Sequence, residues 1–280
     1  MLKETLINSE IQTLKTYYDK VTALLLAGYR SKKFMMNTAE CLKKTYTIMH
    51  STLGTEASLE IGAKGADYSL EMARMYGGAI SLCAIEASPT THAFFSKNND
   101  YKKLGISYIN ALVNDREGDT VFYEYVYKNM EIYAAGISSM FVRDTRKIFD
   151  GTRKRRITVK AIRGDTFIEK NFRNTNKIAV WIDVEWAQEE VLHSLSKTFS
   201  RGAINSVYIE VEEKKLWPRQ KFLVNDIIGF MNKQNFTPYL RDNEYGTQYN
   251  IIFINNNITN CDFSVYFDYY CFLLQKTHIQ

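Results

Sequence analysis

Short apolar runs alternate with helical stretches from Ala57 onward, and this alternation restricts the fold more than any other feature of the chain. The first half contains ASLEIG, SLEMARMYG, AISLCAIE, PTTHAFFSKNN and ISYINALV, and the second half repeats the alternation with KIAVWIDVE, AQEEVLHSLSKTF, SVYIEVE and FLVNDIIGFMNKQ. Strands that alternate with helices form parallel sheets, because each helix returns the chain to the edge where the next strand begins. The sequence therefore predicts an α/β fold with a doubly wound parallel sheet. Between the two halves, roughly from residue 120 to residue 160, VFYEYVYKNMEIYAA and RKRRITVKAI predict a strand pair with an irregular insertion.

The segments on either side of this alternation have different patterns. Residues 1–55 place apolar side chains such as Leu6 and Ile11 at helical spacing, which predicts an N-terminal helical segment. Near the end, NFTPYLRD and YNIIFINN flank a turn that contains Gly246, which predicts a closing hairpin with an antiparallel last strand. We expect three parts, which are a helical segment at 1–55, a ligand-binding domain at 56–256 and an aromatic tail at 257–280.

Composition excludes several classes of protein. Apolar residues make up 45% and charged residues 24%, which is typical of a folded domain and not of a disordered chain. The net charge of +5 is modest, but Arg153 to Arg156 form one basic block, which favours a local anionic partner over a general nucleic-acid surface. The four cysteines form no CxxC pair, and no early apolar run is long enough to span a bilayer. These features predict a cytoplasmic protein with free thiols.

A glycine turn follows the first strand, and an acidic residue ends the second. In SLEIGAKGADYS, Gly62 and Gly65 open a turn into a helix near Asp67, and glycine lets the backbone approach a nucleoside closely. The acid at the helix start and the lack of a third glycine favour a ligand without phosphate at this turn. Glu86 in SLCAIEASP lies about 20 residues further on, where a carboxylate accepts hydrogen bonds from two ribose hydroxyls. An ordinary turn and a solvated strand-end carboxylate are the alternatives.

Two further strand ends carry polar side chains at the same predicted edge. ISYINALV ends a strand at Asn110 and Ala111, which we expect beside the base of the nucleoside. KIAVWIDVEWAQEEVL is apolar up to Asp183 and Glu185. A carboxylate there can act as general base toward a hydroxyl, order an ammonium group or bind a divalent cation. Glu185 can instead cap the next helix, where an acid is favoured by the helix dipole.

Taken in order, LEIGAKGADYS, AIEASP, INALVNDREGDTVFY, WIDVEWAQEEVL and YIEVE resemble the FkbM family of methyltransferases. Family members commonly read DVGANxGxYS, NAAVGDxxGxxxFY and KIDVEGAExxVL at the first, third and fourth of these motifs. The resemblance implies a Rossmann-like seven-stranded methyltransferase sheet, S-adenosylmethionine as donor, S-adenosylhomocysteine as product, and methylation of a hydroxyl, often on a sugar. This chain departs from the pattern at Glu60, Lys64 and Trp186, where the family has Asp, Asn and Gly.

Motifs and resemblance together assign residues to three roles. The residues expected to bind the cofactor are Glu60, Gly62, Ala63, Lys64, Gly65, Tyr68, Glu86, Ala87, Ser88, Asn110, Ala111 and Asp183. The catalytic candidates are carboxylates at strand ends, namely Asp183, Glu185 and Glu210. The candidates for substrate binding are Ser138, Ser139, Arg143, Arg155, Trp186 and Glu212.

Several of these assignments have a second interpretation. Trp186 can wall the acceptor pocket or stack on a sugar, or it can pack against a neighbouring helix. The arginines of the basic block can hold the phosphates of a nucleotide-linked sugar, or form a solvated loop. Glu210 and Glu212 can hold a sugar hydroxyl, supply the base, or be a solvated strand end. By resemblance, Asp165 helps to shape the acceptor side.

The sequence therefore predicts an S-adenosylmethionine-dependent O-methyltransferase that acts on a sugar, a nucleotide-linked sugar or a glycan. An RNA methyltransferase is one alternative, because the basic block and its aromatic neighbours can bind phosphates and stack on bases. A nucleoside-binding module without catalysis is the other. The histidines lack the spacing of metal ligands and no nucleophile elbow is present, so we expect no histidine metal site and no covalent intermediate. An exposed aromatic stripe on a terminal segment would favour a homodimer.

Overall fold

The chain forms two compact units in the computed structural model, which describes residues 2–27, 32–127, 130–134, 136–142, 152–215, 220, 222–259 and 261–278. The first unit combines Met1–Thr55, Ile204–Lys215 and Phe222–Gln280, and the second combines Glu56–Ala203 and Leu216–Lys221. Each unit is built from segments that are distant in the sequence. The three-part division by sequence position stays a prediction.

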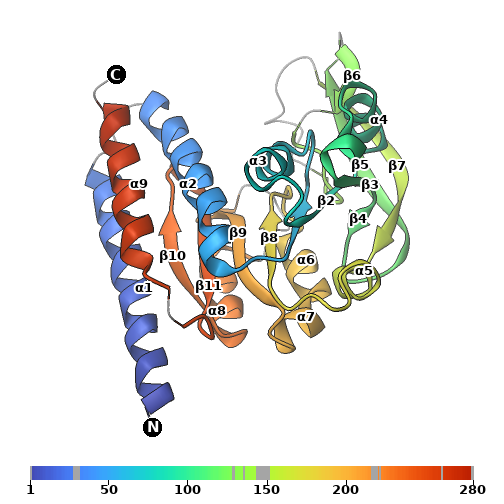
Figure 1. Ribbon diagram of the computed structural model, residues 1–280. Helices are drawn as coiled ribbons and strands as arrows, with labels where there is room; N and C mark the ends of the chain where they lie inside the picture. The colour runs from blue at the N-terminus through green and yellow to red at the C-terminus, as the bar shows by residue number, and fades with distance from the viewer. Residues whose placement is uncertain are drawn as a thin grey trace. The chain divides into compact units, whose positions relative to one another are not determined.

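The strands of the described residues form two sheets (Figure 1). They are β1 (Ala57–Ile61), β2 (Ser81–Glu86), β3 (Ile106–Asn110), β4 (Leu112–Val113), β5 (Gly118–Tyr127), β6 (Met130–Ala134), β7 (Thr152–Ile162), β8 (Ile178–Ile182), β9 (Ile204–Glu212), β10 (Phe236–Arg241) and β11 (Gln248–Asn255). Seven strands follow the order β10-β11-β9-β8-β1-β2-β3, and four follow the order β4-β7-β5-β6. Strands β8, β1, β2 and β3 are parallel, whereas β11 is antiparallel to β9 and β10. The predicted mostly parallel, seven-stranded sheet with an antiparallel last strand is confirmed.

Helices connect most of these strands. They are α1 (Leu2–Ala27), α2 (Lys32–Leu53), α3 (Asp67–Tyr76), α4 (Pro89–Asn98), the 3-10 helix η1 (Tyr101–Leu104), α5 (Gly164–Asn171), α6 (Gln188–Ser194), α7 (Ser196–Ser200), α8 (Val224–Lys233) and α9 (Phe263–His278). Helices α1 and α2 confirm the predicted N-terminal helical segment. Among the helices described, none combines the length and the apolar character needed to cross a membrane.

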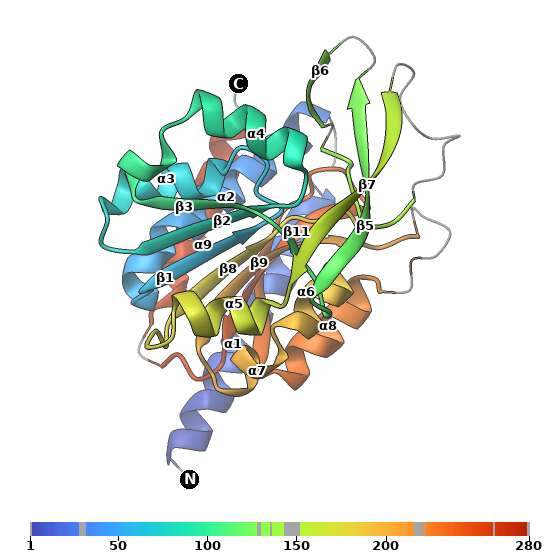
Figure 2. The same ribbon diagram turned by 90° about the vertical axis from the view of Figure 1, so that its right-hand side faces the viewer.

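The parallel strands at the centre of the second unit, β1 and β8, are short and fully buried. Every residue of β1 and β8 is buried, as expected for strands that are apolar on both faces. Figure 2 shows α3 and α4 on one side of these strands and α5 on the other. Helix α4 starts where the sequence supplies a cap, because the Ser88 hydroxyl accepts from the Thr91 N–H at 3.1 Å and Pro89 occupies the first helical position.

The second sheet of this unit is built on a long hairpin-like pair. Strands β5 and β7 are antiparallel from Gly118 opposite Ala161 to Tyr127 opposite Thr152. This pairing confirms the strand pair that the sequence predicts between residues 120 and 160. One face of the sheet carries a small apolar cluster of Leu112, Phe122, Val159 and Ala161, and the segment after β6 joins the edge of β5 through a bridge between Tyr123 and Ser139.

The first unit contains the terminal helices and the antiparallel strands. Helix α1 packs on β10, and α2 packs on α9. The aromatic tail, for which the sequence offered no position, forms the amphipathic helix α9. Its buried side chains recur at helical spacing, at Phe263, Tyr266, Tyr270 and Leu274. The Tyr270 hydroxyl donates to the Arg241 carbonyl at 2.9 Å and thereby anchors the helix on β10.

Candidate functional site

A pocket of about 780 Å³, its open mouth included, lies within the second unit at the carboxyl ends of its parallel strands. Such edges are where open α/β sheets bind ligands. The predicted residues that line it are Gly62, Lys64, Glu86, Ala87, Ser88, Ala111, Ser138, Ser139, Asp183 and Glu185. The other lining residues are mainly apolar and include Ile61, Ile85, Leu112, Val113, Phe122 and Met140. The structure thus brings together candidates from all four sequence motifs and from the second sheet.

Gly62 is required by a close approach of two backbones. Its φ is +81°, and a methyl group at this position would lie 1.8 Å from the Asp183 carbonyl oxygen. The Gly62 and Ala63 N–H groups both donate to the Ile85 carbonyl at 3.0 Å, and the Asp183 N–H donates to the Ile61 carbonyl at 3.0 Å. The glycine therefore lets the ends of β1, β2 and β8 meet at the floor of the pocket.

Three residues other than glycine adopt a left-handed backbone conformation near the pocket. They are Lys64 with φ +46°, Ala66 with φ +56° and Trp186 with φ +73°. Residue by residue, these are the positions at which the family pattern reads Asn, Gly and Gly. Those residue types adopt positive φ at little cost, whereas Lys, Ala and Trp are strained there. The backbone of this chain therefore takes positive φ at three positions where its own residue types disfavour it.

The Glu86 carboxylate is fixed by two backbone donors. Its Oε2 accepts from the Lys64 N–H at 2.8 Å, and its Oε1 accepts from the Ser88 N–H at 2.7 Å. The side chain is only 8% exposed, and this burial raises the pKa of Glu86 to about 7. An ionised carboxylate has about four acceptor positions, so two remain beyond the two backbone bonds.

Residues at the end of β3 bind the main-chain carbonyl of Glu86. The Asn110 side-chain amide donates to the Glu86 carbonyl at 2.8 Å, and the Ala111 N–H donates to the same oxygen at 3.1 Å. Ala111 lines the pocket, whereas Asn110 does not. The Tyr108 hydroxyl donates to the Lys64 carbonyl, which ties β3 to the glycine turn.

The two carboxylates after β8 differ in their surroundings. Asp183 is exposed and lines the pocket, and Glu185 is half-buried. The Ser139 hydroxyl donates to the Glu185 carbonyl, so the loop after β8 is bound to the segment after β6. The neighbouring Ser138 hydroxyl accepts from the Tyr125 N–H at 3.1 Å. Ser138 and Ser139 are therefore part of the wall that the second sheet contributes.

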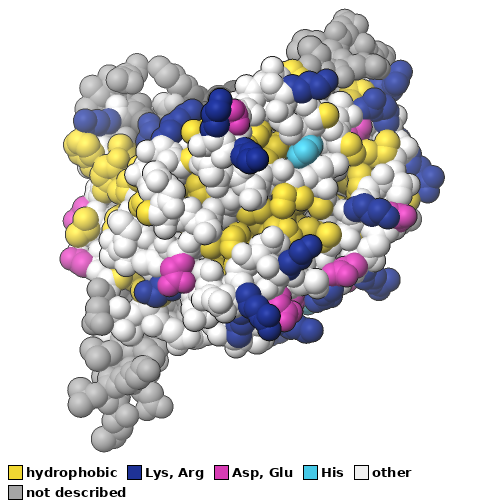
Figure 3. Space-filling view, turned by 45° about the vertical axis from the view of Figure 1, so that its right-hand side comes forward, with side chains coloured by type: hydrophobic (Ala, Val, Ile, Leu, Met, Phe, Trp, Pro, Cys, Tyr) yellow, Lys and Arg dark blue, Asp and Glu magenta, His cyan; other side chains and the backbone are white. Residues whose placement is uncertain are grey.

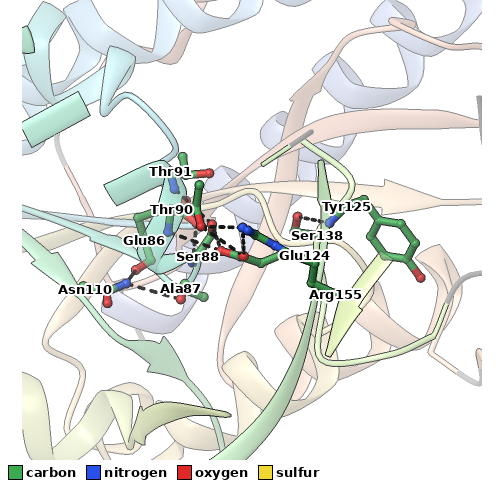
Figure 4. Close-up of polar contacts among 10 residues, drawn as sticks. All are labelled: Glu86, Ala87, Ser88, Thr90, Thr91, Asn110, Glu124, Tyr125, Ser138 and Arg155. Atoms are coloured by element: carbon green, nitrogen blue, oxygen red, sulfur yellow. Dashed lines mark hydrogen bonds and ion pairs between the residues drawn. The ribbon is translucent and has the colours of Figure 1, made fainter. Parts of the chain in front are cut away.

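Glu124 is a buried acid that the motif analysis missed (Figure 4). It lies on β5, is 1% exposed, and accepts from the Ser88 hydroxyl at 2.5 Å and the Thr90 hydroxyl at 3.1 Å. Arg155 on β7 binds it at 2.6 Å and also donates to the Thr90 hydroxyl at 2.7 Å. A single charged residue inside the apolar run VFYEYVY, opposite a basic strand, was the signal that could have revealed it.

The basic block is divided between the two faces of β7, because successive side chains of a strand point to opposite sides. Arg155 faces Glu124, whereas the Lys154 ammonium lies 5.7 Å from the centre of the Tyr123 ring. On the face seen in Figure 3, the coloured Lys and Arg side chains are interspersed with acidic and uncharged ones and form no continuous stripe. The residues of the sequence block therefore do not all face the same side of β7.

Several predicted residues lie outside the pocket lining, namely Glu60, Ala63, Gly65, Tyr68, Asn110, Arg155 and Trp186. The buried Glu60 carboxylate accepts from the Ser69 N–H and hydroxyl, at 2.9 and 2.5 Å, and holds the start of α3. Trp186 is 7% exposed. Asp165 accepts from the Thr198 N–H at 2.8 Å and holds the start of α7.

The remaining predicted residues lie elsewhere in the chain. Glu210 and Glu212 belong to β9 in the first unit, where both are buried. Arg143 lies outside the described residues. Within the described ranges, no group of three or more His, Cys, Asp or Glu residues is arranged to hold a metal ion.

Comparison with known proteins gives the family. Residues 60–238 match the model of the methyltransferase FkbM domain. No curated protein matches the sequence. A methyltransferase dependent on S-adenosylmethionine from Aquifex aeolicus is a structural match at 10% identity and a TM-score of 0.39, over 85% of this chain and 97% of that chain. A precorrin-6y C5,15-methyltransferase from Geobacter metallireducens GS-15 matches at 11% identity and a TM-score of 0.34, over 74% of this chain and 86% of that chain. Because the family model covers more than half of its length, the chain belongs to the FkbM family and is an S-adenosylmethionine-dependent methyltransferase.

Proposed function

We propose that this chain transfers a methyl group, in the cytoplasm, from S-adenosylmethionine to a hydroxyl of a sugar, a nucleotide-linked sugar or a glycan. The observation that carries the proposal is the convergence of Glu86, Asp183 and Glu185 on one pocket that Ser138 and Ser139 also line. A carboxylate for the donor's ribose, a carboxylate for proton removal and hydroxyls beside an apolar wall are the groups that such a transfer needs.

The residues around Glu86 fit the donor. Its carboxylate keeps two acceptor positions, which match the two neighbouring hydroxyls of a ribose. Leu112 and Val113 supply apolar surface nearby, which suits a flat base. Asp183 and Glu185 place negative charge in the same pocket, which favours a ligand with a positive sulfur.

The chain's own task in the reaction is to hold the acceptor oxygen and to take its proton. When bound, S-adenosylmethionine supplies a methyl group that its positive sulfur makes electrophilic. Asp183 is our first candidate for the base because it is exposed, lines the pocket and follows β8 at the binding edge of the sheet. Glu185 is the second candidate, since it lines the same pocket two residues further on.

The acceptor side suits a sugar ring better than a phosphate. Phe122 and Met140 line the pocket together with Ser138 and Ser139, so the lining combines apolar and hydroxyl-bearing side chains. Sugars combine the same two kinds of surface. The Arg155 guanidinium, which we considered for the phosphate of a nucleotide-linked sugar, already binds Glu124 and Thr90.

Formation of S-adenosylhomocysteine in the presence of candidate sugar acceptors tests this proposal. We expect Asp183→Asn to lower kcat by about 100-fold or more, because the acceptor proton is no longer removed, while S-adenosylhomocysteine still binds. Asp119→Asn is the matched control, since Asp119 is an exposed acid of β5 that pairs with Lys160. Full activity in both Asp183→Asn and Glu185→Gln would rule out either of these two pocket carboxylates as the base. Turnover on RNA with none on sugars would replace the proposed acceptor class.

A further inference from the structure

We propose that Glu124 and Arg155 form a positioning pair, which holds the Ser88–Thr90 turn and thereby sets the orientation and the charge of Glu86. The inference rests on the proposed function, in which Glu86 binds the ribose of the donor. It adds a role for two residues of the second sheet, neither of which lines the pocket.

The contacts of Glu124 make it the anchor of this turn. Oε1 accepts from the Ser88 hydroxyl at 2.5 Å and from the Thr90 N–H at 3.2 Å. Oε2 accepts from the Thr90 hydroxyl at 3.1 Å and from Arg155 at 2.6 Å. An acid from β5 therefore binds the first turn of α4 with both of its carboxylate oxygens. Helix α4 follows β2, a strand of the seven-stranded sheet. A carboxylate offers about four acceptor positions, and Glu124 uses all four on this turn and on Arg155.

A short chain of bonds leads from Glu124 to Glu86. Ser88 donates its hydroxyl to Glu124 and its N–H to Glu86 Oε1 at 2.7 Å. The same hydroxyl accepts from the Thr91 N–H and caps α4, so Ser88 is held from three sides. Figure 4 shows Ser88 between the two acids. A shift of Glu124 should therefore shift Ser88, which supplies one of the two N–H donors that orient the Glu86 carboxylate.

Charge connects the two acids as well. The ionisable groups set around Glu86 come from three elements, which are Lys64 after β1, Tyr108 on β3 and Glu124 on β5. The negative charge of Glu124 raises the pKa of Glu86 in addition to the larger effect of burial, and Lys64 lowers it. Arg155 lies behind Glu124 and neutralises it. The pair therefore controls how much negative charge Glu86 experiences.

The pH dependence of S-adenosylhomocysteine affinity, measured by calorimetry from about pH 5.5 to about pH 8, separates this role from a merely structural one. Affinity falls when Glu86 takes up a proton, because it then loses acceptor positions. We call this fall in affinity at low pH the acid limb. In Glu124→Gln the acid limb should move to lower pH by roughly one unit, since Glu86 has lost a negative neighbour. In Arg155→Met it should move to higher pH, because Glu124 is no longer neutralised, and Arg155→Lys should restore the original profile.

Opposite shifts in the two variants support the pair, because misfolding would weaken binding in the same direction in both. The matched controls are Asp119→Asn and Lys160→Met, an exposed ion pair with an N–O distance of 2.6 Å on the same two strands, and neither should move the limb. Unchanged limbs in both test variants, with binding still lost in Glu86→Gln, would overturn the positioning role and leave the proposed function intact. If Glu86→Gln binds as tightly as the wild type, the ribose assignment itself fails. If Glu124→Gln does not fold, the direction of the Arg155→Met shift decides alone.

Discussion

The two sheets of the unit that holds the pocket are built in different ways. Strands β8, β1 and β2 are five or six residues long and almost entirely buried, so helices cover both of their faces. Strands β5 and β7 are ten and eleven residues long, and along β7 buried positions are the exception. The first sheet contributes backbone geometry and carboxylates at strand ends, whereas the second contributes a wall and a charge pair behind it.

The two sides of the pocket therefore constrain the sequence differently, one through backbone contacts and the other through side-chain contacts. At the parallel edge, Gly62 is fixed by contact with the main chain of Asp183. On the second sheet, Glu124 and Arg155 act through their side chains, which are held by each other and by the first turn of α4. In the first sheet we therefore expect the most damage from substitutions that crowd the backbone. In the second sheet we expect it from substitutions that remove a charged side chain.

Gly62→Ala should have the largest effect of all. The added methyl group would meet the Asp183 carbonyl oxygen at 1.8 Å in a conformation with φ +81°, and relief of this clash requires a shift of the backbone. We expect a loss of about 4 kcal/mol or more in the free energy of unfolding, measured by chemical denaturation. Gly78→Ala is the matched control, because Gly78 has φ +89° and nothing within 4 Å of an added methyl group. If both variants lose only about 1 kcal/mol, backbone strain alone explains the glycine.

Arg155→Met should have the next largest effect. It leaves the Glu124 carboxylate buried without its charged partner, which should cost roughly 2–4 kcal/mol of unfolding free energy. Lys160→Met removes an exposed ion pair from the same strand and should cost less than about 1 kcal/mol. Denaturation of the two variants side by side measures the contrast. Equal losses would show that the inward face of the second sheet has no special electrostatic role.

The pH dependence of stability should reveal the buried acids of the first sheet. Burial raises the pKa of Glu60 to about 7, so the folded state binds a proton between about pH 4.5 and 7 that the unfolded state has released. This contribution to stability is present at low pH and is lost as the pH rises through 7. Glu60→Gln mimics the protonated form. The melting temperature of this variant minus that of the wild type should therefore increase as the pH is raised from about 5 to 8. A constant difference across that range would mean that Glu60 does not titrate there.

Lys64→Asn should have the smallest effect. Asn adopts positive φ more readily than Lys, so the substitution should add roughly 0.5 kcal/mol to the free energy of unfolding. The bond from the residue's N–H to Glu86 does not depend on the side chain, so S-adenosylhomocysteine affinity at about pH 8.5, above the pKa of Glu86, should stay within about threefold of the wild type. Thermal denaturation and calorimetry measure the two quantities. A lower stability would mean that the lysine side chain contributes more than its strain costs.

The sequence predicted the first sheet well because its signals are local. Strands β1, β2 and β8 are short, mainly apolar runs, and the acids Glu86 and Asp183, at or just after the ends of β2 and β8, lie at the binding edge. The glycine turn was also found, although the close contact of Gly62 with Asp183 joins residues that are distant in the sequence. The positive φ of Trp186 and Ala66 could not be predicted from the sequence either, because Trp and Ala disfavour that conformation.

The second sheet was predicted only as a strand pair, for physical reasons. Its register aligns Glu124 with Arg155, and a shift by one residue would have placed either side chain on the opposite face. The sequence block of four basic residues could not show which of them faces an acid. Asn110 and Arg155 were expected at the ligand, and the structure gives both of them partners just behind the pocket lining.

A crystal structure with S-adenosylhomocysteine bound tests the account most directly, because it asks whether the two sheets enclose the donor as proposed. We predict that both ribose hydroxyls lie within about 3.2 Å of the Glu86 carboxylate oxygens, with the sulfur facing the part of the pocket that Asp183 and Ser138 line. A ribose bound to any other group, with Glu86 still held only by Lys64 and Ser88, would contradict the central claim.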